Sequence, residues 1–296
     1  MRQPNDTAGR YTWFWLTETP TQEWLPCQAE VTTPALMLGL SVYSSLNWPA
    51  RFDWFEQHWQ RLMHHAGYLG FLQGQGAQNK LREQALNVFN LINQLSEKAQ
   101  TLRLTCVPII NAFSDYLSSD FQKNGMALGI SFRPRVDTIL PQDFCHQGLH
   151  VKTLPYERPM AFMKHGAIAP ELWQRRQANS DDVIWVNASA ELTEASTANI
   201  ALLLPNKTII SPSAPVCLPG LTVSWLADYA TNNHWQMRWQ PVTPQMLWQG
   251  EGLLLSNATC GFRAVSRVDD YALPWPKDLQ ETVRIWQQSF LNNTQT

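Results

Sequence analysis

The apolar residues in the first half of the chain recur at helical spacing in two stretches. The first stretch begins at Asp53, which together with Glu56 is typical of a capping box at a helix start. Its apolar positions predict a single buried stripe. The stripe consists of Phe55, Trp59, Leu62, Met63 and Ala66. Arg61 lies off this stripe, so the pattern alone predicts a solvated side chain there.

A second amphipathic helix is predicted after the glycine-rich stretch 70–76. Its apolar face consists of Leu81, Ala85, Val88, Phe89, Ile92 and Leu95. Strands are predicted at the apolar runs 36–46, 101–110 and 126–133. Gly74 and Gly76 lack a third glycine and a suitable preceding strand, so they do not form a dinucleotide-binding fingerprint.

Strands and helices follow one another in mixed order in the second half. The predicted strands are 149–154, 183–187, 200–204, 208–211, 235–242, 252–256 and 262–268. The predicted helices are 158–177, 220–230 and 277–291. Pro205-Asn206-Lys207 is typical of a hairpin turn between two of these strands. This order favours an α+β fold over a doubly wound sheet.

The length of 296 residues suits two domains, each able to bury a core. The stretch 133–143 contains proline and aspartate and is the best linker candidate. We therefore expect a smaller N-terminal domain at 1–132 and a larger C-terminal domain at 144–296.

Composition and charge exclude several classes of partner. Net charge is −2 and the basic residues are scattered, so no nucleic-acid or anionic-membrane partner is expected. No apolar run approaches the roughly 20 residues of a membrane span, and the start is polar, which predicts a cytoplasmic protein. Five cysteines without C-x-x-C spacing predict neither a disulfide framework nor a metal site.

Five motifs carry candidate chemistry. They are His58-Trp-Gln-Arg61-Leu62, Gly148-Leu-His-Val-Lys152-Thr-Leu-Pro-Tyr156, Leu192-Thr-Glu194-Ala-Ser-Thr-Ala-Asn199, Cys217-Leu-Pro-Gly-Leu221-Thr222 and Ser256-Asn-Ala258-Thr259-Cys-Gly261. From about Leu36 to about Val268, their order and spacing resemble the class IV family of pyridoxal-phosphate (PLP) enzymes. That family holds branched-chain and D-amino-acid transaminases and 4-amino-4-deoxychorismate lyase.

The resemblance implies roles for four side chains toward PLP. Lys152 matches the Schiff-base lysine, which becomes nucleophilic when desolvation and neighbouring cations lower its pKa. Glu194 matches the partner of the pyridine nitrogen, with Glu191 as the competing choice. Arg61 matches the arginine that pairs with the phosphate, which a guanidinium fits with two hydrogen bonds. Tyr156 matches the tyrosine near the ring oxygen.

The resemblance also implies a phosphate site made of backbone amides. Leu221 and Thr222 begin a predicted helix, and the free amides of a helix start attract anions. A plain Pro-Gly helix start is the alternative interpretation. Ala258 and Thr259 match a second phosphate loop; because Ala258 stands where several transaminases have threonine, only the two backbone amides carry over.

Two positions bear on the reaction. Pro108 stands where the resemblance places an arginine that helps transaminases bind the substrate carboxylate. Ser45 stands where the deoxychorismate lyases carry a hydroxyl residue near the lysine. The resemblance thus implies 4-amino-4-deoxychorismate lyase, an enzyme of folate biosynthesis, with Lys152 as the base and Ser45 as a proton relay. Pyruvate is eliminated and 4-aminobenzoate remains.

Two alternatives stay open at this point. A transaminase for branched-chain or D-amino acids would form pyridoxamine from an amino donor, and a non-catalytic relative would keep only the fold. In each case the resemblance implies a two-domain α+β chain of fold type IV, similar to D-amino-acid aminotransferase. It further implies PLP in the cleft between the domains, a homodimer, and a small-molecule substrate that is an amino acid or aminodeoxychorismate.

Overall fold

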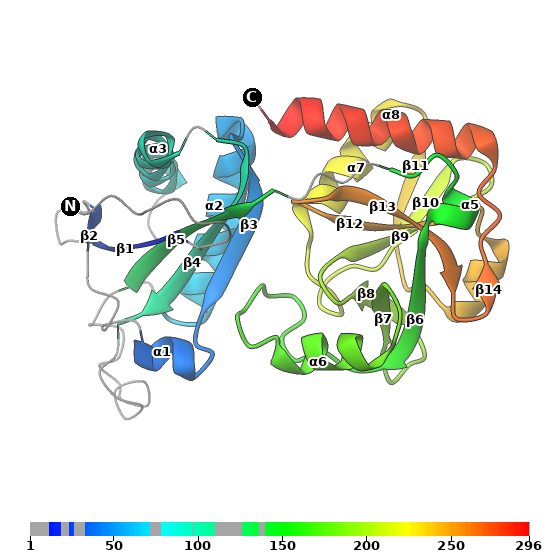
Figure 1. Ribbon diagram of the computed structural model, residues 1–296, viewed down its shortest axis with the longest axis horizontal. Coiled ribbons are helices and arrows are strands. Elements are labelled where there is room, and N and C mark those ends of the chain that lie inside the picture. Colours follow the sequence, from blue (N-terminus) through cyan, green and yellow to red (C-terminus); the bar gives the residue numbers. More distant parts are fainter. Residues whose placement is uncertain are drawn as a thin grey trace. The chain divides into compact units, whose positions relative to one another are not determined.

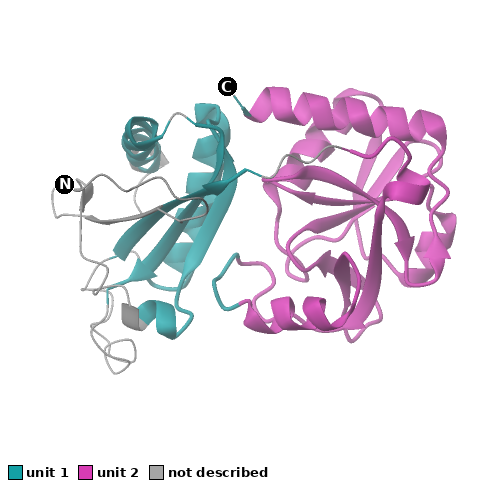
Figure 2. Cartoon of the chain, viewed as in Figure 1, with its two compact units in different colours: residues 1–136, 164–167, 295–296 teal, residues 137–163, 168–294 magenta. Residues whose placement is uncertain are grey.

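The chain divides into two compact units, which Figure 2 shows in separate colours. The computed structural model describes residues 12–18, 24–26, 33–71, 78–96, 98–109, 126–135 and 140–295. The first unit comprises Met1–Val136, Lys164–Ala167 and Gln295–Thr296, and the second comprises Asp137–Met163 and Ile168–Thr294. A short segment from the second half of the sequence, Lys164–Ala167, is therefore part of the first unit.

The first unit contains an antiparallel sheet with strand order β2-β1-β5-β4-β3 (Figure 1). Its strands are β1 (Thr12–Glu18), β2 (Trp24–Pro26), β3 (Val42–Trp48), β4 (Gln100–Pro108) and β5 (Met126–Pro134). Its helices are α1 (Thr33–Met37), α2 (Phe52–Tyr68) and α3 (Gln78–Leu95). Strands β3, β4 and β5 are buried on both faces, although β3 lies at the edge of the sheet, and they form the inner part of this core.

The strand predicted at 36–46 begins later than expected, at Val42, because the short helix α1 precedes it. Most of the glycine-rich stretch 70–76 lies outside the described residues. The same is true of positions 136–139 in the linker candidate 133–143. Both predictions stay untested at those positions.

Helix α2 buries the apolar stripe that the sequence predicts. All five residues of the stripe are at most 3% exposed, which confirms the helical spacing. Aromatic rings tie α2 to its neighbours: Phe55 lies 6.1 Å from Trp48 of β3 and 5.3 Å from Phe89 of α3, between ring centroids. Such edge-to-face pairs add to the free energy gained by burial.

The predicted capping box at the start of α2 is wrong. The helix begins at Phe52 after Arg51, and no side chain caps it. Glu56 instead accepts hydrogen bonds from Arg82 of α3, at 2.8 Å and 3.1 Å. A charge-assisted bond to a guanidinium is stronger than a bond to a backbone amide, so tertiary contact overrides the local signal.

The second unit contains a sheet with strand order β11-β10-β9-β12-β13-β6-β7-β8, and β14 pairs with β13. Its strands are β6 (Leu149–Pro155), β7 (Asp182–Val186), β8 (Leu192–Ala195), β9 (Asn199–Leu204), β10 (Thr208–Ser211), β11 (Gln236–Trp239), β12 (Gly252–Asn257), β13 (Gly261–Val268) and β14 (Tyr271–Ala272). Because β8 also pairs with β9, six of these strands form a closed circuit. The circuit closes where Glu194 pairs in register with Asn199.

Helices pack around this circuit. They are α5 (Phe144–Gln147), α6 (Ala169–Gln177), α7 (Leu221–Asn232) and α8 (Lys277–Thr294), with a 3₁₀ helix, η3, at Pro244–Gln249. Trp225 of α7 and Phe290 of α8 pack on each other and on Phe262 of β13, with centroid distances of 5.3 to 6.3 Å. No helix in the described part of the chain is long and apolar enough to cross a membrane.

Two local predictions in the second unit have different outcomes. The hairpin between β9 and β10 is confirmed: the strands are antiparallel, and Asn206 and Lys207 have φ of 61° and 57°, as a type I′ turn requires. The helix predicted at 158–177 begins only at Ala169, with Pro170 in its first turn. The preceding residues form turns, because Arg158 is held in a buried ion-pair network.

Candidate functional site

The turn before α7 leaves anion-binding groups without partners. Asn199 of β9 donates from Nδ2 to the carbonyl of Leu218 at 2.6 Å. A Cβ atom on Gly220 would overlap Asn199 Oδ1, so only glycine fits here. No side chain caps α7, and Thr222 Oγ1 is buried with no hydrogen-bond partner among the described residues. The helix start therefore offers free amides and a hydroxyl to an anion.

Glu194 is buried in β8, 3% exposed, and both of its oxygens are held. Oε2 accepts a hydrogen bond from the amide of Leu218 at 3.2 Å, and Oε1 accepts one from Arg158 Nη1 at 2.8 Å. The predicted Glu194 motif and the predicted α7 turn are thus bonded directly to each other. Glu191, the competing choice, is occupied locally by the Asn187 side chain at 2.9 Å.

Arg158 connects Glu194 to a second buried carboxylate. Its Nε lies 3.6 Å from Glu171 Oε1, and Glu171 is 2% exposed. Burial, followed by the charge of Glu171 and a hydrogen bond to it, raises the pKa of Tyr156. Tyr156 therefore stays protonated and belongs to a connected set of Tyr156, Glu171, Arg158 and Glu194. Two carboxylates around one guanidinium compensate its buried charge.

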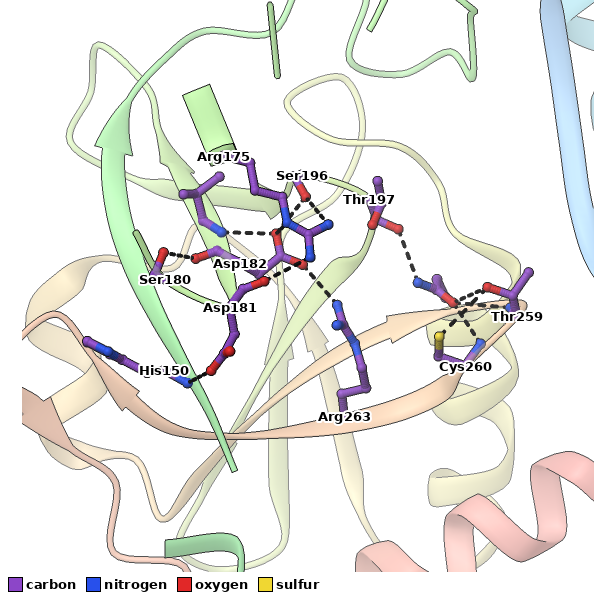
Figure 3. Close-up of polar contacts among 12 residues, drawn as sticks. His150, Arg175, Ser180, Asp181, Asp182, Ser196, Thr197, Thr259, Cys260 and Arg263 are labelled. Carbon is purple, nitrogen blue, oxygen red and sulfur yellow. Dashed lines mark hydrogen bonds and ion pairs between the residues drawn. The ribbon is translucent and has the colours of Figure 1, made fainter. Parts of the chain in front are cut away.

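A fully buried aspartate fixes the turn after Glu194. Figure 3 shows Asp182 between Arg263 and Arg175, with Ser196 above it. Arg263 Nη2 lies 2.9 Å from Asp182 Oδ2, Arg175 Nε lies 3.7 Å from Oδ1, and the Ser196 hydroxyl donates to Oδ1 at 2.5 Å. Because Ser196 lies two residues after Glu194, this network holds the end of β8 in place.

The loop 256–261 folds around the side chain of Asn257. Its Oδ1 accepts hydrogen bonds from the amides of Thr259 and Cys260, at 3.1 Å and 2.8 Å, and Nδ2 donates to Thr197 O (Figure 3). The amide of Thr259 is therefore already engaged, which leaves Ala258 as the predicted phosphate contact in this loop. Ser256 Oγ is buried without a partner in the described structure and adds a hydroxyl that the sequence prediction did not include.

Lys152 lies in the middle of β6, opposite Val183 of β7. On the same face of β6, Leu154 packs against Trp185 and Ala178. The ring of Tyr156 also lies on Trp185, with 5.1 Å between centroids. The Lys152 ammonium makes no hydrogen bond or ion pair with any residue that the structure describes. The structure therefore places Lys152 on the strand as predicted, without bringing a described partner to its side chain.

Arg61, in the first unit, is held against β3 rather than solvated. Its Nη2 donates to Ser44 Oγ at 3.1 Å, and Ser44 Oγ in turn lies 2.8 Å from His58 Nδ1. Burial lowers the pKa of Arg61 to about 10, with Tyr43 opposing the shift. Nε is buried without a partner, and no ion pair involves Arg61 among the described residues. The solvated side chain predicted from the pattern alone is wrong, and the uncompensated charge calls for an anion.

Ser45 and Pro108 lie on the neighbouring strands β3 and β4. Ser45 pairs in register with Arg103 of β4, whose guanidinium lies 3.6 Å from the ring centroid of Tyr43. Pro108 is the last residue of β4, opposite Met126. Ser44, not Ser45, is the serine that contacts Arg61, because successive side chains of a strand point to opposite faces.

The sequence assigns no role to three residues that the structure joins to the predicted ones: Arg158, Ser44 and His58. Arg158 follows a strand in the stretch Tyr156-Glu-Arg-Pro, and only its ion-pair partners, more than ten residues away, reveal its burial. His58 lies one turn before Arg61 on α2 and could have been noted from that spacing.

Solved structures with the same fold are transaminases and a lyase. A branched-chain aminotransferase from Thermoproteus uzoniensis, crystallised with norvaline, is 14% identical, with 96% of each chain covered and a TM-score of 0.74. A putative 4-amino-4-deoxychorismate lyase from Legionella pneumophila is 15% identical, with 87% of this chain and 93% of that chain covered and a TM-score of 0.71. A branched-chain amino acid aminotransferase from T.th. with pyridoxamine 5′-phosphate is 13% identical, with 96% of this chain and 95% of that chain covered and a TM-score of 0.73.

At these identities the solved structures establish the fold, and the family follows from the sequence. Among curated proteins, no sequence matches this chain. Residues 46–268 match the family model for amino-transferase class IV. That match covers well over half of the 296 residues. The protein therefore belongs to the class IV aminotransferase family, whose members are PLP-dependent enzymes.

Proposed function

We propose that this protein binds PLP and acts as a 4-amino-4-deoxychorismate lyase. The observation that carries the proposal is the bond between buried Glu194 and the turn that begins α7. That bond puts an acceptor for a protonated ring nitrogen beside an anion-binding helix start. PLP carries a pyridine nitrogen and a phosphate on one small ring, so it suits this pair of groups.

The unpartnered polar atoms fit such a phosphate. Thr222 Oγ1 and Ser256 Oγ are buried hydroxyls without partners in the described structure, and the amides of Leu221, Thr222 and Ala258 are the backbone candidates. In the first unit, Arg61 supplies a guanidinium that lacks an anion among the described residues. The Schiff-base lysine predicted from the resemblance is Lys152, and Tyr156 is the predicted partner of the ring oxygen. A homodimer, as the resemblance implies, is part of this proposal.

Each protein group has one task in the proposed elimination. When bound, PLP accepts the electron pair released at the amine-bearing carbon of the substrate. Glu194, fixed by Arg158 and Leu218, holds a proton at the ring nitrogen. The lysine amine takes the proton from the amine-bearing carbon, and Ser45 relays a proton to the departing group. The products are pyruvate and 4-aminobenzoate in equal amounts.

Two features favour the lyase over the transaminase within this proposal. Pro108 cannot supply the side-chain cation that the resemblance associates with transaminase substrates. Arg103 pairs in register with Ser45 and its guanidinium lies over the ring of Tyr43, and aminodeoxychorismate carries two carboxylates that a guanidinium can bind. We therefore expect Arg103→Met to raise KM for this substrate more than it lowers kcat.

The test is a product assay on the PLP-loaded protein. With aminodeoxychorismate, we expect 4-aminobenzoate and pyruvate in a one-to-one ratio. With L- and D-amino acids and a keto-acid acceptor, we expect no new amino acid. Glu194→Ala should abolish turnover, and the matched variant Glu191→Ala should retain it. Rapid transamination together with no 4-aminobenzoate would replace the lyase by a transaminase.

A further inference from the structure

Lys164 lies in the short segment that is part of the first unit, and its backbone is held on two sides. Its carbonyl accepts a hydrogen bond from the amide of Tyr43 at 3.0 Å, and its amide donates to His65 Nδ1 at 3.3 Å. Two residues on, Gly166 donates to the carbonyl of Ser41 at 2.8 Å, and a Cβ there would overlap Ser41 Oγ. The segment therefore lies tightly along the start of β3.

The side chain of Lys164 lies among buried basic groups. Its Nζ lies 4.9 Å from the ring centroid of Tyr43. Burial, followed by Arg61 and then by other neighbours that include Lys164, lowers the pKa of His65 to about 3. Burial, then Arg61, then Lys164 also lower the pKa of His58. Both imidazoles are therefore neutral, and Lys164 and Arg61 lie close to the same two rings.

A lysine amine becomes a nucleophile where neighbouring cations and burial disfavour its ammonium form. Lys164 has such a neighbour in Arg61. Lys152, in the middle of β6, shares its face with Leu154 and makes no polar contact with a described residue. The structure therefore distinguishes the two lysines by their surroundings, although the sequence resemblance selects Lys152.

The position of Arg61 also favours Lys164 over Lys152 as the lysine that reacts with PLP. It is the predicted partner of the PLP phosphate, and it lacks an anion in the described structure. The phosphate and the aldehyde of PLP are carried by one ring, so the reacting amine has to lie near the guanidinium that binds the phosphate. Lys164 meets this condition within the first unit, because its amide bonds to His65 Nδ1 and Arg61 precedes His65 by one turn on α2.

We propose that Lys164, rather than Lys152, forms the covalent bond to PLP; this rests on the proposed PLP-dependent function. Nζ of Lys164 attacks the aldehyde carbon, a C=N bond forms, and the aldehyde oxygen leaves as water with both amine protons. The same amine is then the base at the amine-bearing carbon of the substrate.

The test is to trap this bond chemically and locate it. Borohydride adds hydride to the C=N carbon and converts the bond to a stable secondary amine. The PLP-loaded wild-type protein is reduced, digested with trypsin and analysed by mass spectrometry. We expect the phosphopyridoxyl mass on a peptide with a missed cleavage at Lys164. Lys164→Ala should lose both this mass and the visible absorbance of bound PLP, whereas the matched variant Lys152→Ala should keep both.

Other outcomes separate this inference from the function on which it rests. A label at Lys152 in the wild type would overturn the inference and leave the PLP-dependent function standing. No label at either lysine, with no absorbance change on adding PLP, would overturn both. Circular dichroism of both variants shows whether they fold, and if Lys164→Ala fails to fold, the position of the wild-type label still decides.

Discussion

Two partly buried arginines, Arg158 and Arg61, have opposite electrostatic surroundings. Arg158 lies between Glu194 and Glu171, so its charge is compensated within the second unit. Arg61 bonds to the hydroxyl of Ser44, and its Nε has no partner among the described residues. Desolvating a charge is costly unless an opposite charge compensates it. The difference teaches that the charge of Arg158 is compensated within the fold, whereas that of Arg61 is not, which is why we propose Arg61 as the partner of an anion.

The largest expected effect comes from replacing Arg158, the arginine whose charge is compensated by two carboxylates. Arg158→Met leaves two buried carboxylates without their cation, which should lower the free energy of unfolding by about 3–5 kcal/mol. Urea denaturation measures this loss. Arg51→Met, which removes an exposed partner of Asp53, is the control and should change stability far less. Equal losses for both variants would show that Arg158 is not the central group of its network.

Removing the uncompensated arginine should affect binding more than folding. Arg61→Met eliminates a buried charge that has no carboxylate, so urea denaturation without PLP should show little loss of stability. PLP affinity should fall at least about thirtyfold, because a charged partner of the phosphate is lost. Titration of PLP absorbance measures the affinity. Unchanged PLP affinity would contradict the anion role of Arg61.

Acid should lower the stability of the folded protein through His65, which lies near Arg61. Its pKa is about 3 in the folded protein against 6.5 ordinarily, so the unfolded chain binds the extra proton between these values. Stability is therefore complete above pH 6.5 and falls as pH drops toward 3. The expected loss is about 2 kcal/mol over the first two pH units below the ordinary value. Urea denaturation of wild type and His65→Gln should differ in this slope, and parallel slopes would exclude His65 as the cause.

The smallest expected effect tests the outer member of the Arg158 network. Tyr156→Phe removes a hydroxyl beside the buried Glu171, which should cost about 1 kcal/mol or less in urea denaturation. Because Arg158 still compensates Glu171, the loss should stay well below that of Arg158→Met. If the two losses were equal, the hydroxyl rather than the guanidinium would be holding the carboxylates.

The sequence predicts elements well where one buried face dictates the pattern. The stripe on α2 and the hairpin at Asn206 and Lys207 depend on local spacing and turn chemistry, and both are confirmed. The motif around Glu194 is also recognisable, because a carboxylate, a glycine turn and a helix start follow in order. Pattern therefore identifies most of the strands and helices and the main candidate groups of the site.

The sequence does not reveal the surroundings of side chains whose partners lie far away in the chain. Glu56 does not cap α2 as expected, because it forms an ion pair with Arg82 of α3. Arg61 looks solvated on its helix, and only β3 shows that it is covered. No nearby sequence pattern marks Lys164 as a candidate, because the residues that contact it belong to β3 and α2, about a hundred residues earlier in the chain.

The closed circuit of strands has a consequence for handling the protein. Its closure between β8 and β9 depends on one register pair, Glu194 with Asn199. If that pairing opens, the free edge of β8 presents unpaired backbone groups, which are templates for pairing with other molecules. We therefore expect opening of this closure to show itself first as aggregation during concentration, visible by light scattering, before any change in helix content.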